Sequence, residues 1–312
     1  MKQILTILFV LVFVNGVYPS EKKCIEGDCK NGFGTEIDAD GGKCVGQWKN
    51  GKLNGQGTYI APDGGKYEGN WKNGEYDGYG VMSWPDGVTN YKGEWKNSKR
   101  HGNGCITVSD GSVYTGEWKD DKMCGHGIYT ETNGLRYEGE WKNSEQNGEG
   151  VMVYPDGSKY TGSWKNNLRH GKGTFIELNG MKYEGEWKDD MKNGKGKLTW
   201  PGGGANYTGM WKDDNRHGKG IMTLPDGTKY DGDWKDDKKH GNGLFYIPGR
   251  GEYNGEWVND RMEGKGTHTW VNGRKHVGQW KDDKPNGFGI LYDKNGKIEK
   301  KGMWKDGKFI GE

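Results

Sequence analysis

Apolar and polar residues alternate along most of the chain, in a pattern that returns every 23 residues and occasionally every 24. The clearest copy spans residues 137–159, where Tyr137, Gly139 and Trp141 take alternate positions and charged residues stand between them. Such alternation predicts β-strands whose side chains point to opposite faces in turn. A period between about 20 and 50 residues is typical of repeat proteins, in which each repeat packs only against its neighbours.

Each repeat is expected to be a β-hairpin. The first strand is predicted over residues 137–142, and a six-residue polar loop follows it. Gly148, Gly150 and Met152 then share one parity of a second strand, and a Pro-Asp-Gly turn joins the next repeat. Strand glycines leave room for large rings from neighbouring strands. The sequence therefore predicts an all-β fold: an elongated single-layer antiparallel meander that forms a twisted rod.

A tryptophan occurs once at the same position of every repeat, four residues after the opening residue. We expect these rings to cover the glycines of adjacent strands and to be structural. They are Trp48, Trp71, Trp95, Trp118, Trp141, Trp164, Trp187, Trp211, Trp234, Trp257, Trp280 and Trp304.

The chain divides into four segments. Residues 1–16 resemble a signal peptide with cleavage near 16–20, because a charged start precedes the apolar run 4–14. An uncleaved anchor is the rival hypothesis. Residues 17–43 form a linker and a degenerate capping repeat, residues 44–299 hold eleven repeats, and residues 300–312 form a terminal half repeat. A secreted, periplasmic or cell-surface location follows, and the polar residues before Cys24 argue against a lipoprotein.

Five cysteines are present, and two of them flank the turn of the capping repeat. In an exported protein, Cys24 and Cys29 are expected to form a disulfide, with two packed thiols as the alternative. Cys44, Cys105 and Cys124 lie in different repeats, so they provide no metal site, and at least one of them stays unpaired.

Composition supports a repeat protein over a globular domain. Only 30% of the residues are hydrophobic, 59 are glycine and 29% are charged, whereas a globular core needs close to half apolar residues. Disorder is excluded by 15 tryptophans and 17 tyrosines. The net charge of +2 comes from 46 basic and 44 acidic residues, so no nucleic-acid partner is expected.

The pattern Y-x-G-x-W-K-[ND]-x-x-x-[HN]-G-x-G, with a closing Asp-Gly, resembles the MORN repeat (membrane occupation and recognition nexus) over residues 44–312. Departures are the openings Cys44 and His276, Val258 in the lysine position, and single insertions after Pro85 and Pro201. The resemblance implies an elongated scaffold that binds proteins or membranes. Where such arrays accompany an enzyme, catalysis lies in a separate domain.

Two recurring polar groups could suggest metal binding. Histidines recur at one position, but equivalent positions in adjacent repeats lie about 9.5 Å apart, too far for one zinc ion. Paired aspartates after the tryptophan are interpreted as solvated loop tips, because two carboxylates per repeat are too few for calcium. The Gly-x-Gly pairs lack the helix that a phosphate site requires. No metal, cofactor or enzymatic activity is expected. The histidines are His101, His170, His217 and His240, and the pairs begin at Asp120, Asp189, Asp213, Asp236 and Asp282.

Four repeats carry an extra aromatic residue two positions after the apolar position of the second strand. These residues, here called the aromatic platform, are Trp84, Tyr154, Trp200 and Trp270. They either widen the apolar stripe or form a surface for partners. We expect an exported scaffold for protein partners. The alternatives are a peripheral membrane or phospholipid-binding module and an envelope carbohydrate-binding protein, and a homodimer is left open.

Overall fold

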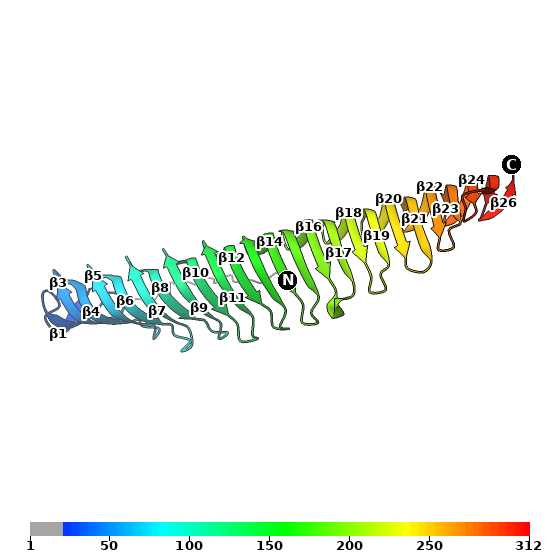
Figure 1. Cartoon of the computed structure of the whole chain (residues 1–312). Helices are drawn as coiled ribbons and strands as arrows, with labels where there is room; N and C mark the ends of the chain where they lie inside the picture. Colours follow the sequence, from blue (N-terminus) through cyan, green and yellow to red (C-terminus); the bar gives the residue numbers. More distant parts are fainter. Residues whose placement is uncertain (1–20) are drawn as a thin grey trace. The chain divides into compact units, whose positions relative to one another are not determined.

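The computed structural model describes residues 21–312, and this part of the chain is almost entirely β-structure. It contains one open 26-stranded sheet and a single three-residue 3₁₀ turn. Strands that follow one another in sequence pair antiparallel, as β11 does with β10 and with β12 (Figure 1). The prediction of an all-β, single-layer antiparallel meander is confirmed. The predicted signal peptide, residues 1–16, lies outside the described residues.

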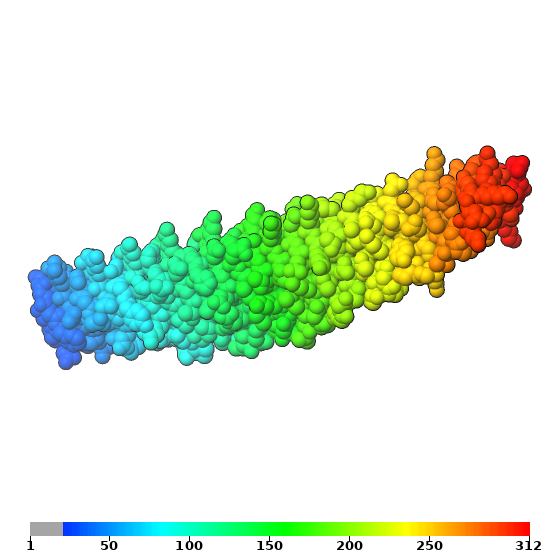
Figure 2. Space-filling view, in the orientation of Figure 1, coloured from blue at the N-terminus to red at the C-terminus, as the bar shows by residue number. Residues whose placement is uncertain are grey.

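The chain forms two compact units, which are described separately. Unit 1 ends at Pro155 and also holds Trp164–Asn167, and unit 2 holds Asp156–Ser163 and Leu168–Glu312. Consecutive repeats lie side by side in sequence order within each unit (Figure 2). The strands that precede Pro155 are β1 (Lys23–Gly27), β2 (Phe33–Ile37), β3 (Lys43–Lys49), β4 (Lys52–Ile60), β5 (Lys66–Lys72), β6 (Glu75–Ser83), β7 (Asn90–Lys96), β8 (Lys99–Thr107), β9 (Val113–Lys119), β10 (Lys122–Thr130), β11 (Arg136–Lys142) and β12 (Glu145–Val153).

The remaining elements repeat the same alternation of a shorter and a longer strand. They are β13 (Lys159–Lys165), β14 (Leu168–Ile176), β15 (Lys182–Lys188), β16 (Met191–Thr199), η1 (Pro201–Gly203), β17 (Asn206–Lys212), β18 (Asn215–Thr223), β19 (Lys229–Lys235), β20 (Lys238–Ile247), β21 (Gly251–Val258), β22 (Arg261–Trp270), β23 (Lys275–Lys281), β24 (Lys284–Tyr292), β25 (Ile298–Lys305) and β26 (Lys308–Gly311).

The turn of each hairpin is much shorter than expected. β11 ends at Lys142 and β12 begins at Glu145, so only Asn143 and Ser144 connect them. Both have positive φ, 52° and 66°, as a type I′ turn requires, and Asn and Asp tolerate this conformation best among residues with a Cβ. The prediction of a six-residue polar loop is wrong, because the polar residues after the turn belong to the second strand.

The first glycine of each Gly-x-Gly pair sits at a β-bulge. The register of β11 and β12 shifts between Gly139 and Trp141, which leaves Glu140 without an opposite residue. Its carboxylate accepts a hydrogen bond from the backbone N–H of Glu149 (3.1 Å). Gly148 has a φ of +74°, and a Cβ there would collide with this carboxylate. Glycine is therefore needed at position 148 for both conformation and space.

Tyrosine and tryptophan rings form an aromatic column on one face of the sheet in each unit. Tyr137 is fully buried and lies against Gly150, where a Cβ would come within 2.5 Å of its hydroxyl oxygen. Its ring makes edge-to-face contacts with Trp141 (5.1 Å between centroids) and with Trp164 of the next repeat (5.4 Å). The indole N–H of Trp141 donates to the carbonyl of Gly127 in the previous repeat (3.2 Å). The expected packing of rings over glycine is confirmed for the second glycine, as at Gly150, whereas the first, Gly148, faces the carboxylate of Glu140.

Each turn also forms hydrogen bonds with the preceding hairpin. Asp121, the second turn residue after β9, accepts hydrogen bonds from the backbone N–H (3.1 Å) and the Nε–H (3.0 Å) of Arg100. The Arg100 guanidinium lies 4.3 Å from the ring of Trp118. The interpretation of the aspartate pairs as mere solvated loop tips is therefore wrong for the second member. The same backbone bond joins Ser144 to Met123, Asn167 to Gln146, Asp190 to Arg169, Asp214 to Lys192, Asp237 to Arg216, Asp260 to Lys239 and Asp283 to Met262.

This coupling predicts different effects for two adjacent aspartates. Asp121→Ala removes the acceptor facing Arg100, which is only 4% exposed. Relative to Asp120→Ala, it should lower the free energy of unfolding by about 1–3 kcal/mol. Both variants lose an aspartate from a positive-φ position, so the difference compares the hydrogen bonds of Asp121 with the longer contact of Asp120 to His101, 3.9 Å from Oδ1 to Nδ1. Urea denaturation of the two proteins measures it, and equal losses would contradict the proposed role of Asp121.

Candidate functional site

Three of the four recurrent histidines contact aspartates of the neighbouring hairpin, and no such contact is found for His240 among the residues that the structure describes. The Nδ1 atoms of His101, His170 and His217 lie 3.9, 3.4 and 3.5 Å from the Oδ1 of the first turn aspartate of the next repeat. These are pairwise contacts between turns. Within residues 21–312, no group of three or more His, Cys, Asp or Glu side chains converges as a metal site.

The aromatic platform residues all lie where a second strand ends. Trp84, Tyr154 and Trp200 directly follow β6, β12 and β16, and Trp270 is the last residue of β22. The first three are half-buried and Trp270 is 36% exposed. Trp84 and Tyr154 are three repeats apart in unit 1, as are Trp200 and Trp270 in unit 2. Three repeats correspond to about 29 Å of sheet, so neither unit brings its pair into contact.

Aliphatic residues that the sequence reasoning missed are also exposed between the repeats. They lie in the inter-repeat loops, the segments that join the second strand of one repeat to the first strand of the next. Val88 is 46% exposed in unit 1, and Leu178, Leu224 and Val271 are 77%, 37% and 70% exposed in unit 2. In the sequence, the signal for this exposed surface was an isolated apolar residue among turn-forming Pro, Asp, Asn and Gly. These loops carry apolar surface in addition to the four aromatic rings.

A second feature lies at the start of the aromatic column, where one ring is missing. Nine repeats open with tyrosine and the last with His276, but the first opens with Cys44. In later repeats the opening ring covers a glycine, as Tyr67 covers Gly80. The corresponding Gly57 is instead approached by Trp71, 3.1 Å from an added Cβ. No tyrosine ring therefore separates the first two tryptophans of the column.

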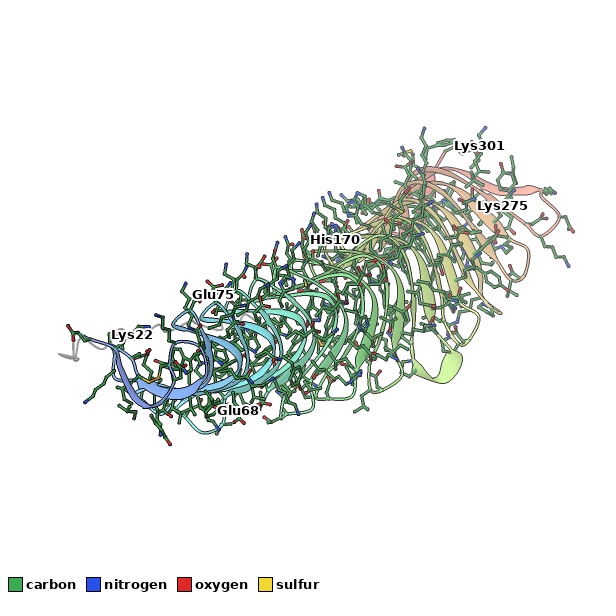
Figure 3. The ribbon with its side chains drawn as sticks, turned by 90° about the vertical axis from the view of Figure 1, so that its left-hand side faces the viewer. Lys22, Glu68, Glu75, His170, Lys275 and Lys301 are labelled. Atoms are coloured by element: carbon green, nitrogen blue, oxygen red, sulfur yellow. A yellow bond between two sulfur atoms is a disulfide. The ribbon has the colours of Figure 1, made fainter. Side chains whose placement is uncertain are left out.

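A pocket of about 600 Å³ opens at this gap, in unit 1. Trp48, Trp71, Tyr59 and Tyr76 contribute aromatic surface to its lining, and Cys44 lies among them. Three carboxylates and two lysines complete its charged lining: Glu36, Asp38, Glu75, Lys22 and Lys52. Figure 3 labels Lys22 and Glu75, and it shows the strands as arcs around the interior of the curved sheet. We call this feature the N-terminal pocket.

Glu36 is the unusual residue of the N-terminal pocket. It pairs with Cys44 across β2 and β3, so both side chains leave the sheet on the same face. The residue is 8% exposed, and its Oε1 atom has no hydrogen-bond partner. The Nζ of Lys22 lies 3.7 Å from this oxygen, on a side chain that is 65% exposed. A buried carboxylate oxygen without a hydrogen bond is costly.

Sequence alignment of the cap could have identified Glu36. The residue two positions after the second glycine of Gly-x-Gly is apolar in most repeats, as Met152 is after Gly150. In the capping repeat that glycine is Gly34, which places Glu36 in the apolar position. Two departures from the repeat pattern, Glu36 and Cys44, thus face each other.

The N-terminal pocket has a negative electrostatic environment. Burial raises the pKa of the Cys44 thiol to about 11, and the carboxylates of Asp38 and Glu36 add to the rise. Burial also raises the pKa of Tyr59 to about 12, with Asp38 the next cause. Both groups therefore stay neutral near pH 7. The thiol at this position is a poor nucleophile, because the thiolate is the reactive form.

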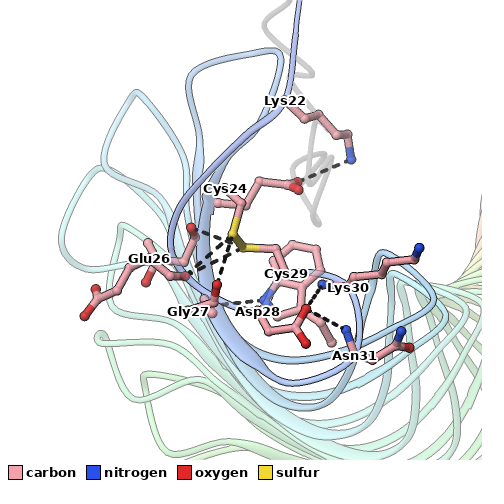
Figure 4. Close-up of a disulfide and its surroundings, with 12 residues drawn as sticks. Lys22, Cys24, Glu26, Gly27, Asp28, Cys29, Lys30 and Asn31 are labelled. Atoms are coloured by element: carbon pink, nitrogen blue, oxygen red, sulfur yellow. Dashed lines mark hydrogen bonds and ion pairs between the residues drawn. A yellow bond between two sulfur atoms is a disulfide. The ribbon is translucent and has the colours of Figure 1, made fainter.

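The capping repeat is fastened by a disulfide between Cys24 and Cys29 (Figure 4). Their Cα atoms are 5.9 Å apart, and the bond ties β1 to the turn before β2. Within that turn, the carboxylate of Asp28 accepts hydrogen bonds from the backbone N–H groups of Lys30 (2.8 Å) and Asn31 (3.0 Å). The other cysteines, Cys44, Cys105 and Cys124, are free thiols.

Comparison with protein-family models identifies the repeats. The model described as MORN repeat matches eleven segments: residues 44–66, 67–89, 91–113, 114–136, 137–159, 160–176, 183–205, 207–229, 230–250, 253–273 and 276–298. A search of curated proteins finds no match.

Solved structures give only distant likenesses. The TCP10 domain of Danio rerio CPAP in complex with a peptide of Danio rerio STIL is 12% identical, with a TM-score of 0.26, over 91% of this chain and 100% of that one. The SAS-4 (dCPAP) TCP domain of Drosophila melanogaster, in complex with a proline-rich motif of Ana2 (dSTIL), is 13% identical, with a TM-score of 0.28, over 56% and 82%. Likenesses this weak carry no argument about the present chain.

Among the helical residues that the structure describes, none forms a segment with the length and apolarity needed to cross a bilayer.

Proposed function

Because the chain belongs to the MORN-repeat family, we propose that it is an exported, non-enzymatic scaffold that binds protein partners along its inter-repeat loops. MORN repeats are a class of protein- or membrane-binding repeats. One observation carries the proposal: the aromatic column is buried, whereas Leu178 and Val271 on the loops are 77% and 70% exposed. Exposed apolar side chains offer surface that a partner can cover, and contiguous patches of them mark interaction sites.

The division of residues between core and loops supports a binding role. The column rings, such as Tyr137 and Trp141, are buried at 0% and 5% exposure and are committed to the contacts between repeats. The loop positions vary instead between aromatic, aliphatic and acidic residues, as Trp84, Val108 and Glu131 show. A partner can therefore be recognised by loop residues without any change in the framework.

Export is supported by the apolar leader and by the cap. Residues 1–16 have the pattern of a signal peptide, and the Cys24–Cys29 disulfide suits an oxidising compartment. We expect mass spectrometry of the protein from its native source to find a new N-terminus near Val17. An intact Met1 in a cytosolic fraction would refute export and leave the binding proposal to be judged separately.

The binding proposal predicts a selective effect of the aromatic platform. Changing Trp84, Tyr154, Trp200 and Trp270 to threonine should keep the thermal melt nearly unchanged, because Glu131 occupies the same position in another repeat. The same change should weaken binding of the partner that crosslinking captures from the native compartment by at least about tenfold, since buried aromatic residues dominate interface energies. A second variant replaces Val108 and Leu224, two aliphatic residues that also lie on inter-repeat loops, with threonine.

Four outcomes decide between the hypotheses. Unchanged binding with an unchanged melt would exclude the platform as the contact surface, and a collapsed melt would assign its rings to the core. If the wild-type chain floats with phospholipid vesicles and the variant does not, the membrane hypothesis replaces the protein partner. Selective binding on a glycan array would favour the carbohydrate hypothesis instead.

A further inference from the structure

The N-terminal pocket combines two departures from the repeat at one point of the sheet. Cys44 occupies a position that other repeats fill with a ring, and Glu36 occupies a position that most repeats fill with an apolar side chain. The two residues are direct cross-strand partners. A missing ring alone would leave a dry apolar gap. Because a carboxylate lines this gap, the group that fills it must be planar, to replace the ring, and positively charged, to pair with the carboxylate.

The array shows elsewhere which group satisfies this combination. Arg169 stacks on Trp187, with 4.2 Å from its guanidinium carbon to the ring centroid, while its Nε–H bonds the carboxylate of Asp190 (3.0 Å). Arg216 does the same with Trp234 and Asp237, at 4.3 Å and 2.8 Å. A guanidinium is planar, stacks on indole rings and binds carboxylates through two N–H groups at once. Arg100 repeats this arrangement with Trp118 and Asp121, and lysine takes the place of arginine at Lys192 and Lys239.

We propose that the N-terminal pocket binds an arginine side chain of a protein partner. The guanidinium fills the space between Trp48 and Trp71 that a tyrosine ring occupies in later repeats, and it pairs with Glu36. The site rests on the proposed function, because the arginine belongs to a partner of the scaffold. It adds a specific anchor at the capped end to the apolar contacts of the inter-repeat loops.

The negative charge of the pocket favours arginine over other side chains of similar size. Asp38 and Glu75 line the pocket together with Glu36, against Lys22 and Lys52, so an acidic group would be repelled. A partner tyrosine would fill the gap but would leave the excess negative charge uncompensated. Burial is the main cause of the raised pKa of Cys44, and the carboxylates of Asp38 and Glu36 raise it further. A cationic, planar group satisfies the shape and the charge together.

Lys22 behaves as a weak internal competitor. Its ammonium is the nearest cation to Glu36, but it stands 3.7 Å away on a side chain that is 65% exposed. An ion pair this exposed contributes little to stability. A partner arginine can therefore displace Lys22 at small cost. Removing the lysine charge should make the pocket bind an arginine side chain more tightly.

The test uses the full chain and two short peptides, acetyl-Gly-Gly-Arg-Gly-Gly-amide and its citrulline counterpart, which has the same shape without the charge. We expect saturable binding of the arginine peptide by calorimetry, with shifts of the indole N–H signals of Trp48 and Trp71, and at least about tenfold weaker binding of citrulline. Glu36→Gln should weaken arginine binding to the citrulline level. Lys22→Ala should strengthen it several-fold.

Cys44→Tyr separates the binding role from a structural one. The new ring should complete the aromatic column, raise the melting temperature and abolish arginine binding. Cys44→Ser keeps the space and should keep the binding. Glu68→Gln is the charge-matched control, because Glu68 is an exposed residue of the neighbouring strand β5, paired with Lys66 (Figure 3). It should leave the affinity unchanged.

The proposal is overturned if the arginine peptide does not bind at millimolar concentration, if citrulline binds equally well, or if Cys44→Tyr folds and still binds arginine. These failures are distinguishable from failure of the proposed function. A captured partner whose affinity is indifferent to Glu36→Gln would refute the site and leave the scaffold role intact. Arginine binding that depends on Glu36, without any protein partner in the native compartment, would support the site and refute the scaffold role.

Discussion

The structure depends on a tyrosine ring that lies over glycine between two tryptophans. Tyr137 contacts Trp141 of its own repeat and Trp164 of the next at about equal distances, 5.1 and 5.4 Å. Only a glycine at position 150 leaves room for that ring. A single sheet has no opposing layer to bury its apolar face, so the rings must cover the backbone and one another. The composition, rich in glycine and tryptophan and poor in aliphatic residues, follows from this requirement.

The same constraint divides the chain into fixed and free positions. The ring, the glycines and the turn residues are committed to contacts between repeats, as the bonds from Arg100 to Asp121 illustrate. The inter-repeat loops are not committed, and there Leu178 and Val271 are exposed to solvent. Recognition is therefore expected at two kinds of place: on these loops, and where the column itself is interrupted, at Cys44. In both cases, residues that depart from the repeat pattern indicate a binding site better than residues that follow it.

The sequence alone was sufficient for the strands, the meander and the packing of rings over glycine, because the two-residue alternation and the 23-residue period leave few other folds. It misplaced the turn after Lys142, because polar residues in a second strand resemble a loop when only polarity is considered. It also missed the role of Asp121, which depends on a residue 21 positions earlier. The sequence did not predict the N-terminal pocket, because Cys44 and Glu36 are seen to face each other only when β2 and β3 are paired.

The most direct test of the column as the source of stability compares two deletions in unit 1. Removing residues 114–136 takes out one complete repeat, so the ring of Tyr91 should contact the ring of Trp141 as it now contacts Trp118. Removing only residues 122–132 takes out a strand and places the following rings out of register. Circular dichroism with urea denaturation should show a cooperative, native-like protein for the first deletion and loss of cooperative unfolding for the second. Equal behaviour of the two would contradict the account.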